Sequence, residues 1–268
     1  MSLFDLKGEV AVVIGGTGVL GGAIAEAFGT AGAKVAVLGR NADRGGARVQ
    51  TIRTAGGTAA FYDCDAMSRE SLRAACEKLE RELGAPTVLL NAAGGADPNA
   101  IVTADKPLEN LPLAAWEKNF DLNLIGGVLL PCQEFCPGMV ARRRGSVINI
   151  ASVSAHIALS RVISYSAAKA AVLSMTQFLS REYAKSGVRV NSITPGFFPA
   201  EQNRKLLFND DGTPTPRTLS VWAHTPMGRF GEARELVGAA LFLASEKAAS
   251  FVTGTDIRVD GGFLSQTI

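Results

Sequence analysis

The stretch Val10-Ala-Val-Val-Ile14-Gly15-Gly-Thr-Gly-Val-Leu-Gly-Gly22 joins five apolar residues to a run that is rich in glycine. Gly16, Gly18 and Gly21 have the G-x-G-x-x-G spacing, and the residues that follow are typical of a helix. In a strand–turn–helix unit, such glycines let the backbone approach a pyrophosphate, which then lies at the positive N-terminal end of the helix. The stretch therefore predicts a dinucleotide site; a glycine turn with a purely structural role is the alternative.

Short apolar runs alternate with longer amphipathic stretches along the whole chain. The predicted strands are Val10–Ile14, Lys34–Leu38, Thr58–Tyr62, Thr87–Leu90, Ser146–Ile150, Arg189–Ile193 and Asp256–Val259. Most are continuously apolar, as expected for parallel strands that are covered on both faces. The predicted helices are Leu20–Ala31, Asp43–Ala55, Arg69–Leu83, Ala114–Arg143, Ile163–Ser186 and Ala233–Leu243. We therefore expect an α/β fold: a single NAD(P)-binding Rossmann domain over residues 1–268, with a doubly wound, mostly parallel seven-stranded sheet and helices on both faces.

Residues 195–231 interrupt this alternation between the sixth and the seventh predicted strand. The segment contains five prolines and the turn-like Asn209-Asp-Asp-Gly212. An excursion of this length is either a disordered loop or a functional lid. Because apolar and polar residues alternate in Asn203-Arg-Lys-Leu-Leu-Phe208, we favour a partly helical lid. Residues 195–231 are called the lid segment below.

The composition is typical of a globular α/β protein. The 268 residues are 47% hydrophobic and 19% charged, with a formal net charge of +2. Since no basic cluster exceeds Arg142-Arg143-Arg144, nothing indicates binding to nucleic acid or to a membrane surface. No apolar run reaches the ~18 residues that span a bilayer, and the amino-terminal residues carry charges where a secretory signal is apolar. The four cysteines lack metal-ligand spacing. We expect a cytoplasmic protein without a metal site.

A second informative stretch runs from Ser152 to Lys169. Tyr165 and Lys169 are four residues apart in a helix-forming run, so their side chains share one helix face. A phenol has a pKa near ~10, and a neighbouring ammonium would lower that pKa, which suits Tyr165 to general acid/base work. Ser152 ends an apolar strand, where its hydroxyl can bind a substrate oxygen. For the spacing alone, a surface helix with an incidental tyrosine and lysine is the alternative.

The end of the second predicted strand bears on the choice of cofactor. In NAD-binding folds, a carboxylate at this place binds the ribose 2′-hydroxyl. The chain reads Val37-Leu-Gly-Arg40-Asn41 there and has no acid. Arg40 can instead pair with a 2′-phosphate, so the sequence favours NADP. NAD is the alternative if Arg40 stacks on the adenine or faces solvent.

Taken together, these motifs resemble those of the short-chain dehydrogenase/reductase family, in its single-domain branch. The resemblance rests on the glycine loop, Asp65, Asn91-Ala-Ala-Gly94, Asn123, Ser152, Tyr165-x-x-x-Lys169, Pro195-Gly196 and Val259-Asp-Gly-Gly262, in this order. It implies hydride transfer between a nicotinamide and a substrate carbon, and the implied catalytic residues are Asn123, Ser152, Tyr165 and Lys169. Asn123 would anchor a water of the proton relay. The resemblance also implies a homotetramer in which the helices predicted at 114–143 and 163–186 pair between subunits.

The same resemblance implies a set of cofactor contacts. Asp65 would bond the adenine amino group beside Ala66, Asn91 would brace the central strands, and Phe198 would lie near the nicotinamide carboxamide. The full implied set is Gly15, Thr17, Gly18, Val19, Leu20, Arg40, Asn41, Asp65, Ala66, Asn91, Ala93, Tyr165, Lys169, Pro195, Gly196 and Phe198.

The lid segment is similar to that of the D-mannonate oxidoreductases (fructuronate reductases) within this family. The similarity lies in three stretches, 195–204, 206–215 and 224–231, and implies a sugar-acid substrate of the D-mannonate/D-fructuronate type. Predicted substrate contacts are His156, Arg161, Asn203 and Arg204. Arg161 could hold a carboxylate, and a solvated surface arginine is the alternative. Another polyol, a gluconate-type ketoacid or a small ketone are alternative substrates, and a non-catalytic dinucleotide-binding protein is a remote alternative.

Overall fold

The structure is a computed structural model that describes residues 2–200 and 204–266. Asn203, one of the predicted substrate contacts, lies outside the described residues.

All seven predicted strands are present in one sheet, in the order β3-β2-β1-β4-β5-β6-β7. Their bounds are β1 (Val10–Ile14), β2 (Lys34–Gly39), β3 (Thr58–Asp63), β4 (Val88–Asn91), β5 (Gly145–Ile150), β6 (Val188–Pro195) and β7 (Asp256–Val259). Every pairing is parallel. The strand order reverses between β1 and β4, and in such sheets ligands bind beyond the carboxyl ends of the strands at this point.

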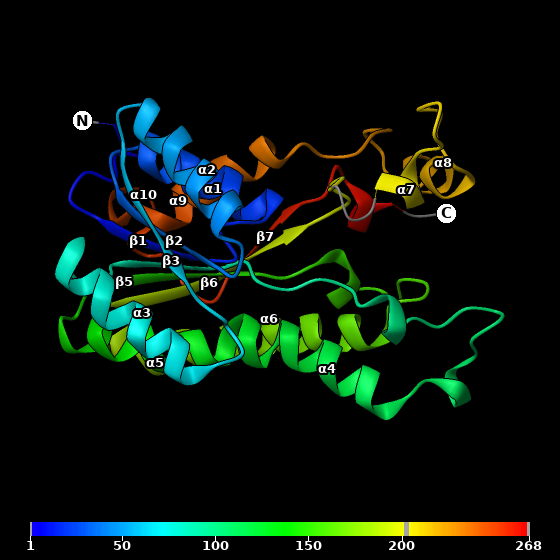
Figure 1. Cartoon of the computed structure of the whole chain (residues 1–268), viewed down its shortest axis with the longest axis horizontal. Helices are drawn as coiled ribbons and strands as arrows, with labels where there is room; N and C mark the ends of the chain where they lie inside the picture. The colour runs from blue at the N-terminus through cyan, green and yellow to red at the C-terminus, as the bar shows by residue number, and fades with distance from the viewer. Residues whose placement is uncertain (1, 201–203, 267–268) are drawn as a thin grey trace.

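Helices cover both faces of the sheet (Figure 1). One face carries α1 (Val19–Thr30), α2 (Ala42–Thr54), α9 (Val237–Ala244) and α10 (Glu246–Ala249); the other carries α3 (Arg69–Glu82), α4 (Leu113–Asn123), α5 (Leu130–Ala141) and α6 (Ile163–Tyr183). Alternate residues of β1 enter different cores: Val12 belongs to the core that includes Phe135 of α5, and Val13 to the core that includes Phe28 of α1. The prediction of a doubly wound sheet is confirmed.

The prediction of one continuous helix over 114–143 is wrong. A π-helical turn, Ile125–Leu129, separates α4 from α5. Pro131 has no N–H for the carbonyl four residues earlier, and two adjacent glycines lower the helix propensity of the turn itself. The wider turn brings Gly126 against the loop after β3, where a Cβ on Gly126 would lie only 3.2 Å from the Ala66 carbonyl oxygen. The break therefore fits α4 and α5 around the edge of the predicted cofactor site.

The stretch Leu113–Ala141 is also long and apolar enough, by length and composition, to span a membrane. This corrects the expectation that the chain has no such run. Nearly half of the stretch is buried, and Phe135 and Met139 lie fully in the core, as in the central helix of a globular protein. Smaller boundary differences occur elsewhere: α6 ends in a 3₁₀ turn, Ala184–Ser186, and α9 is preceded by another, Ala233–Leu236.

The described part of the lid segment contains two short helices, so it is partly helical, as predicted. They are α7 (Arg204–Leu207) and α8 (Pro216–Ala223). Leu207, Val221 and Phe230 form a small core of their own, separate from the two cores of the sheet. In Figure 1, α7 and α8 lie beyond the carboxyl ends of the strands. The lid segment is thus a unit of its own that stands over the edge of the sheet where a ligand is expected.

Candidate active site

Three buried polar side chains link β4, β5 and α6 through the middle of the molecule. The Asn91 amide donates to Asn149 Oδ1 at 2.9 Å, and the Asn149 amide donates to Thr176 Oγ1 at 2.9 Å. All three are at most 1% exposed. Because buried polar groups need hydrogen-bond partners, these two hydrogen bonds fix α6 against the two strands. The bracing implied for Asn91 is present in the structure.

Ser152 follows β5 and is almost completely buried. Its Oγ accepts hydrogen bonds from Ser154 N at 3.2 Å and from Ser154 Oγ at 3.1 Å. Ser152 also interacts with the Tyr165 hydroxyl, and this hydrogen bond lowers the pKa of Tyr165. Ser154, which the sequence analysis did not single out, therefore holds the Ser152 side chain in place.

α6 presents Tyr165 and Lys169 on the same side. Lys169 Nζ lies 5.6 Å from the centroid of the Tyr165 ring and donates to the Ile150 carbonyl oxygen at 2.7 Å. Lys169 is 4% exposed, and its burial lowers the pKa of the ammonium to about 8. Burial disfavours the charged form of the lysine, so this group gives up its proton more readily than a surface lysine does.

The pKa of Tyr165 differs in direction from the expectation. The four-residue spacing to Lys169 predicted a lowered pKa, but burial raises it, and the hydrogen bond with Ser152 is the smaller, opposing effect. The nearby ammonium is committed to the Ile150 carbonyl. Consequently Tyr165 is a protonated phenol at neutral pH, which prepares it to donate a proton.

Asn123, at the end of α4, holds the loop that follows β4. Its Oδ1 accepts from Gly95 N at 2.9 Å, and its Nδ2 donates to the carbonyls of Gly95 (2.9 Å) and Asn119 (2.8 Å). A Cβ on Gly94 would collide with Asn123 Oδ1 and lie 3.5 Å from Lys169 Nζ. The structure thus brings Asn123 and Lys169 to the same loop, although the Asn123 amide is engaged by backbone groups.

The glycine loop after β1 fits a dinucleotide. Gly15 has φ +77°, and a Cβ there would lie 2.7 Å from Ala93 N, so no larger residue fits. Gly18 is the N-cap of α1 and has no side chain that could bond the free N–H groups of the first turn. Val19 and Leu20 begin this turn. Exposed N–H groups at the positive end of a helix are the usual site for a pyrophosphate.

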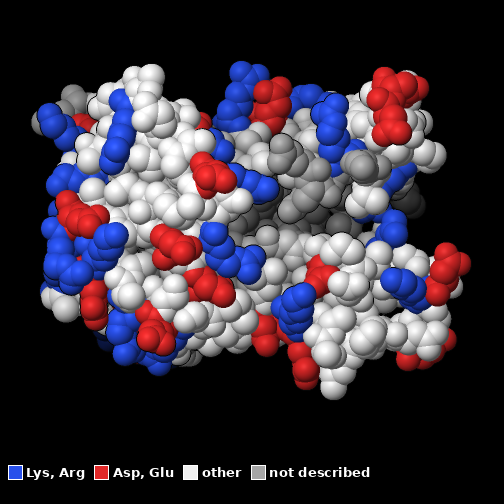
Figure 2. All heavy atoms as spheres, viewed as in Figure 1, with Lys and Arg blue, Asp and Glu red and all other residues white. Residues whose placement is uncertain are grey.

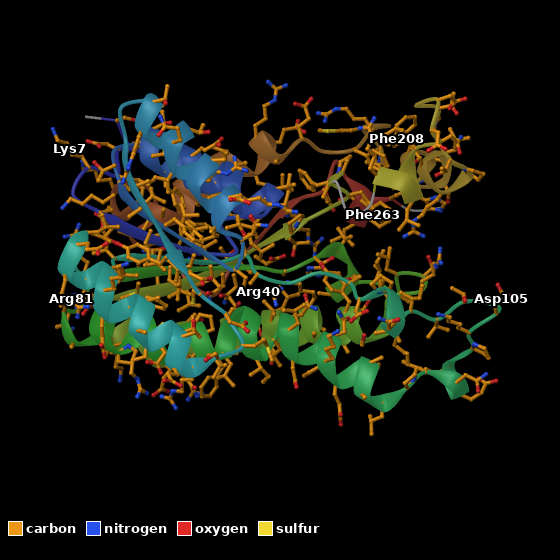
Figure 3. All side chains as sticks on the ribbon, in the orientation of Figure 1. Lys7, Arg40, Arg81, Asp105, Phe208 and Phe263 are labelled. Atoms are coloured by element: carbon orange, nitrogen blue, oxygen red, sulfur yellow. The ribbon has the colours of Figure 1, made fainter. Side chains whose placement is uncertain are left out.

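The tip of β2 lies next to this loop. A Cβ on Gly39 would be 2.6 Å from Thr17 Oγ1, which places Thr17 directly beside the tip. Asn41 Oδ1 accepts from Arg44 N at 2.9 Å and caps α2, so this side chain is already occupied. Arg40 is exposed at the same tip (Figure 3), and among the described residues its guanidinium has no hydrogen bond or ion pair.

The remaining implied cofactor residues lie in loops at the carboxyl ends of β3 and β6. Asp65 and Ala66 follow β3. Pro195 ends β6, and Gly196 N donates back to β7 at 3.0 Å. Phe198 lines a cavity of about 390 Å³ between the lid segment and the end of β7. All these groups follow carboxyl ends of strands, where a cofactor bound at the strand-order reversal would lie.

The predicted substrate contacts have different surroundings. His156 Nε2 lies 3.2 Å from Thr194 Oγ1 and 3.3 Å from Asp256 Oδ2, so this nitrogen is engaged within the protein. Arg161 lines a cavity of about 310 Å³ beside α6, and Arg204 is exposed on α7. Figure 2 shows a hollow between the lid segment and the body below it, with Lys and Arg side chains on the rim. Among the described residues, no three His, Cys, Asp or Glu side chains form a group that could hold a metal.

A family model described as enoyl-(acyl carrier protein) reductase matches residues 17–264, which is nearly the whole chain. The chain belongs to the short-chain dehydrogenase/reductase family. The uncharacterized oxidoreductase UxuB of Bacillus subtilis (strain 168) is 39% identical to this family member, over 97% of its chain and 96% of the relative. A 2-dehydro-3-deoxy-D-gluconate 5-dehydrogenase of Formosa agariphila is 33% identical, over 99% and 96%.

A solved structure is similar to this chain in both fold and sequence. A provisionally assigned D-mannonate oxidoreductase from Haemophilus influenza, with bound NAD, has a TM-score of 0.92 and 34% identity, covering 98% of this chain and 97% of the other. The present short-chain dehydrogenase/reductase is therefore an NAD(P)-dependent oxidoreductase, as predicted.

Besides Ser154, two more supporting residues were missed in the sequence. Asn119 donates to the Gly95 carbonyl at 2.9 Å and accepts from Ser164 Oγ at 2.9 Å, so it ties α4, the loop after β4 and α6 together beside Tyr165. Asp256 faces His156 from β7. Neither belongs to a spacing pattern, because their partners are far away in the chain. Only a polar residue inside an otherwise buried helix or strand could have signalled them.

Proposed function

We propose that this enzyme interconverts a keto sugar acid and its hydroxy acid, of the D-fructuronate/D-mannonate type, with NADP as the preferred cofactor. The reaction type rests on one arrangement: Ser152 interacts with Tyr165, burial raises the pKa of Tyr165, and Lys169 Nζ lies 5.6 Å from the centroid of its ring. The substrate class is supported by the names of two similar proteins, a dehydrogenase of a deoxygluconate and a provisionally assigned D-mannonate oxidoreductase.

In the reducing direction the chain must hold a carbonyl and supply one proton to its oxygen, while a bound nicotinamide supplies the hydride. The hydroxyls of Ser152 and Tyr165 interact with each other, and both would donate to this oxygen. As charge develops on the oxygen, Tyr165 gives it the proton. The hydroxyl of Ser152 is held for this task by Ser154.

Lys169 would act on Tyr165 after the proton has left. A phenolate in a buried site is costly unless a positive charge is near it. The Lys169 ammonium, fixed by the Ile150 carbonyl at 2.7 Å, provides this charge. By the family resemblance it would also bind the nicotinamide ribose, and Asn123 would contribute to the proton relay. Here Asn123 additionally holds Gly95, so its loss would disturb the loop as well.

The preference for NADP is supported by the tip of β2. Asn41 is used in the cap of α2, and Arg40 has no partner among the described residues, so a guanidinium is available where a 2′-phosphate would lie. The solved relative from Haemophilus influenza contains NAD, so the two cofactors must be compared directly.

The test is a screen of NADPH and NADH oxidation with D-fructuronate, 5-keto-D-gluconate, D-fructose and a small ketone. We expect the highest kcat/KM with a keto sugar acid and NADPH, and none with the Tyr165→Phe variant. Comparable or higher kcat/KM with the neutral ketones would contradict the proposed substrate class. A strong preference for NADH would contradict the proposed cofactor.

We also propose a homotetramer, as the family resemblance implies. Large apolar side chains are exposed on the helices concerned, among them Leu113 of α4 (69%) and Phe178 of α6 (63%). Burial between subunits would remove this apolar surface from water. Light scattering on the purified protein gives the subunit number, and a monomer would contradict the proposal. The cytoplasmic location stays a prediction from the sequence.

A further inference from the structure

A buried hydrogen bond joins α4 to the first turn of α6. Ser164 Oγ donates to Asn119 Oδ1 at 2.9 Å, and both residues are at most 1% exposed. Ser164 stands directly before Tyr165 in this turn. The two helices pack against each other on one face of the sheet (Figure 1). The bond therefore holds the backbone that carries Tyr165 at a fixed place against α4.

The first turn of α6 is weakly held by local interactions. Val162, at its N-cap, has an apolar side chain that cannot bond the free N–H groups of the turn. The residue before it, Arg161, has φ +77°, a left-handed conformation that is uncommon for a residue other than glycine. A helix end without a polar cap is weaker than a capped one, so contacts with the rest of the molecule must hold this turn.

The other half of the Asn119 amide reaches the loop after β4. Asn119 Nδ2 donates to the Gly95 carbonyl oxygen at 2.9 Å. The preceding residue, Gly94, approaches Lys169, since a Cβ on Gly94 would lie 3.5 Å from Lys169 Nζ. One buried amide thus sets the distance between the turn that carries Tyr165 and the loop beside Lys169.

Asn123 makes the loop contact of Asn119 partly redundant. Its Oδ1 accepts from Gly95 N and its Nδ2 donates to the Gly95 carbonyl oxygen, both at 2.9 Å. The Gly95 backbone thus keeps two hydrogen bonds when Asn119 is replaced. The buried Ser164 hydroxyl, in contrast, would lose its acceptor. Replacing Asn119 should therefore disturb the turn of Tyr165 more than the loop.

We propose that Asn119 and Ser164 are positioning residues that hold Tyr165 in place for proton transfer, an inference that rests on the proposed role of Tyr165 as the proton donor. Both act through the backbone of α6 rather than on the reacting atoms. Misplacement of a reacting group by about 1 Å can lower a rate by roughly 10²-fold. The pair should therefore affect kcat, while binding of the cofactor at the glycine loop should be nearly unchanged.

The experiment measures kcat and the KM of the preferred cofactor in Ser164→Ala, in Asn119→Leu and in the double variant, with the best substrate of the screen. Ser164→Ala removes one oxygen, and Asn119→Leu keeps the approximate size of the side chain. We expect kcat to fall by about tenfold or more in each, and the KM of the cofactor to change by less than about threefold. Because both substitutions break the same bond, the double variant should be within about twofold of the slower single variant.

Asn191→Leu is the matched control. Asn191 is a buried asparagine of β6, and its amide also makes two hydrogen bonds, to the Val252 carbonyl oxygen at 3.0 Å and from Thr255 N at 3.1 Å. Its loss should lower the melting temperature but leave the kcat of the folded enzyme within about twofold. If kcat fell as far in this control as in Asn119→Leu, the loss of any buried asparagine would have the same effect, which would contradict the positioning role.

The solvent deuterium isotope effect separates positioning from a loss of folded protein. A misplaced donor slows proton transfer relative to the other steps, so the isotope effect on kcat should be larger in Ser164→Ala than in the wild type. A smaller folded fraction lowers kcat without changing this isotope effect. An unchanged kcat in both single variants, or a lower kcat with the isotope effect of the wild type, would overturn the inference and leave the proposed function standing. A Tyr165→Phe variant that keeps its activity would overturn both.

Discussion

His156 and Asp256 face each other across the end of β6, with Nε2 of the ring 3.3 Å from Oδ2 of the carboxylate. His156 lies on the loop after Ser152, and Asp256 begins β7. The other carboxylate oxygen accepts from Ser192 Oγ at 2.7 Å and from Thr194 Oγ1 at 2.9 Å. Asp256 therefore connects the loop that follows Ser152 to β6 and β7, at the edge of the sheet where the nicotinamide is expected.

The two oxygens of Asp256 allow a graded test of this tie. Asp256→Ala leaves two buried hydroxyls without their acceptor, and we expect the free energy of unfolding to fall by about 2–3 kcal/mol. Asp256→Asn keeps one oxygen for Ser192 and Thr194, so its cost should be about 1 kcal/mol or less. Urea unfolding of both variants measures this difference. Equal losses in the two variants would mean that the hydroxyl contacts contribute little.

Tyr165→Phe removes the proposed proton donor and leaves the ring in place. We expect kcat to fall by about 10²- to 10⁴-fold, which is the range for loss of a general acid, while the dissociation constant of NADPH changes by less than about twofold. Tyr183→Phe, at the other end of α6, is the matched control and should keep its activity. Stopped-flow fluorescence gives cofactor binding, and initial rates give kcat. A Tyr165→Phe enzyme with near-normal kcat would exclude the tyrosine as the donor.

Lys169 makes stability depend on pH in a definite direction. Its pKa is about 8 in the folded chain, below the ordinary lysine value of 10.5, because the ammonium is buried. Between these values the unfolded chain binds the extra proton, so the contribution of Lys169 to the free energy of unfolding rises with pH from 8 upward. The burial of its ammonium costs stability below pH 8, by about 3 kcal/mol from the pKa difference. Lys169→Met should therefore be more stable than the wild type at pH 7.

The stability of the wild type must be compared with that of Lys169→Met because other groups also titrate at alkaline pH. Burial raises the pKa of Cys64 to about 11 and that of Cys76 to about 12, so these thiols make the stability of the chain fall at alkaline pH. They are present in both proteins and cancel in the difference. The advantage of Lys169→Met should shrink from pH 8 to pH 9.5 in guanidinium unfolding without cofactor. A difference that is constant over this range would show that the lysine pKa is not depressed.

The sheet was predictable because each parallel strand is buried on both faces and therefore appears as a continuous apolar run. Val10–Ile14 and Asp256–Val259 have the predicted bounds. Where prediction was wrong, at the π-helical turn Ile125–Leu129, apolar composition favoured a continuous helix, and the proline that removes one N–H lies outside the turn itself. Local hydrogen bonding, which hydropathy does not report, decided the geometry.

The candidate site was predictable to the extent that its residues have fixed spacings. Tyr165 and Lys169 share a helix turn, and the structure brings Tyr165 to Ser152, as the motif implies. The predicted direction of the Tyr165 pKa shift was wrong, because the spacing indicates a neighbouring charge but not the depth of burial.

Arg40 should decide between the two cofactors. If its guanidinium pairs with the 2′-phosphate, Arg40→Ser removes a charge-assisted hydrogen bond that NAD never makes. We expect the KM for NADPH to rise by about tenfold or more, and the KM for NADH to change by less than about threefold. Arg44→Ser, which removes an exposed arginine in the first turn of α2, is the control and should alter neither value. Steady-state kinetics with both cofactors gives the comparison. If both KM values rise together, Arg40 stacks on the adenine that the two cofactors share, and the preference for NADP loses its basis.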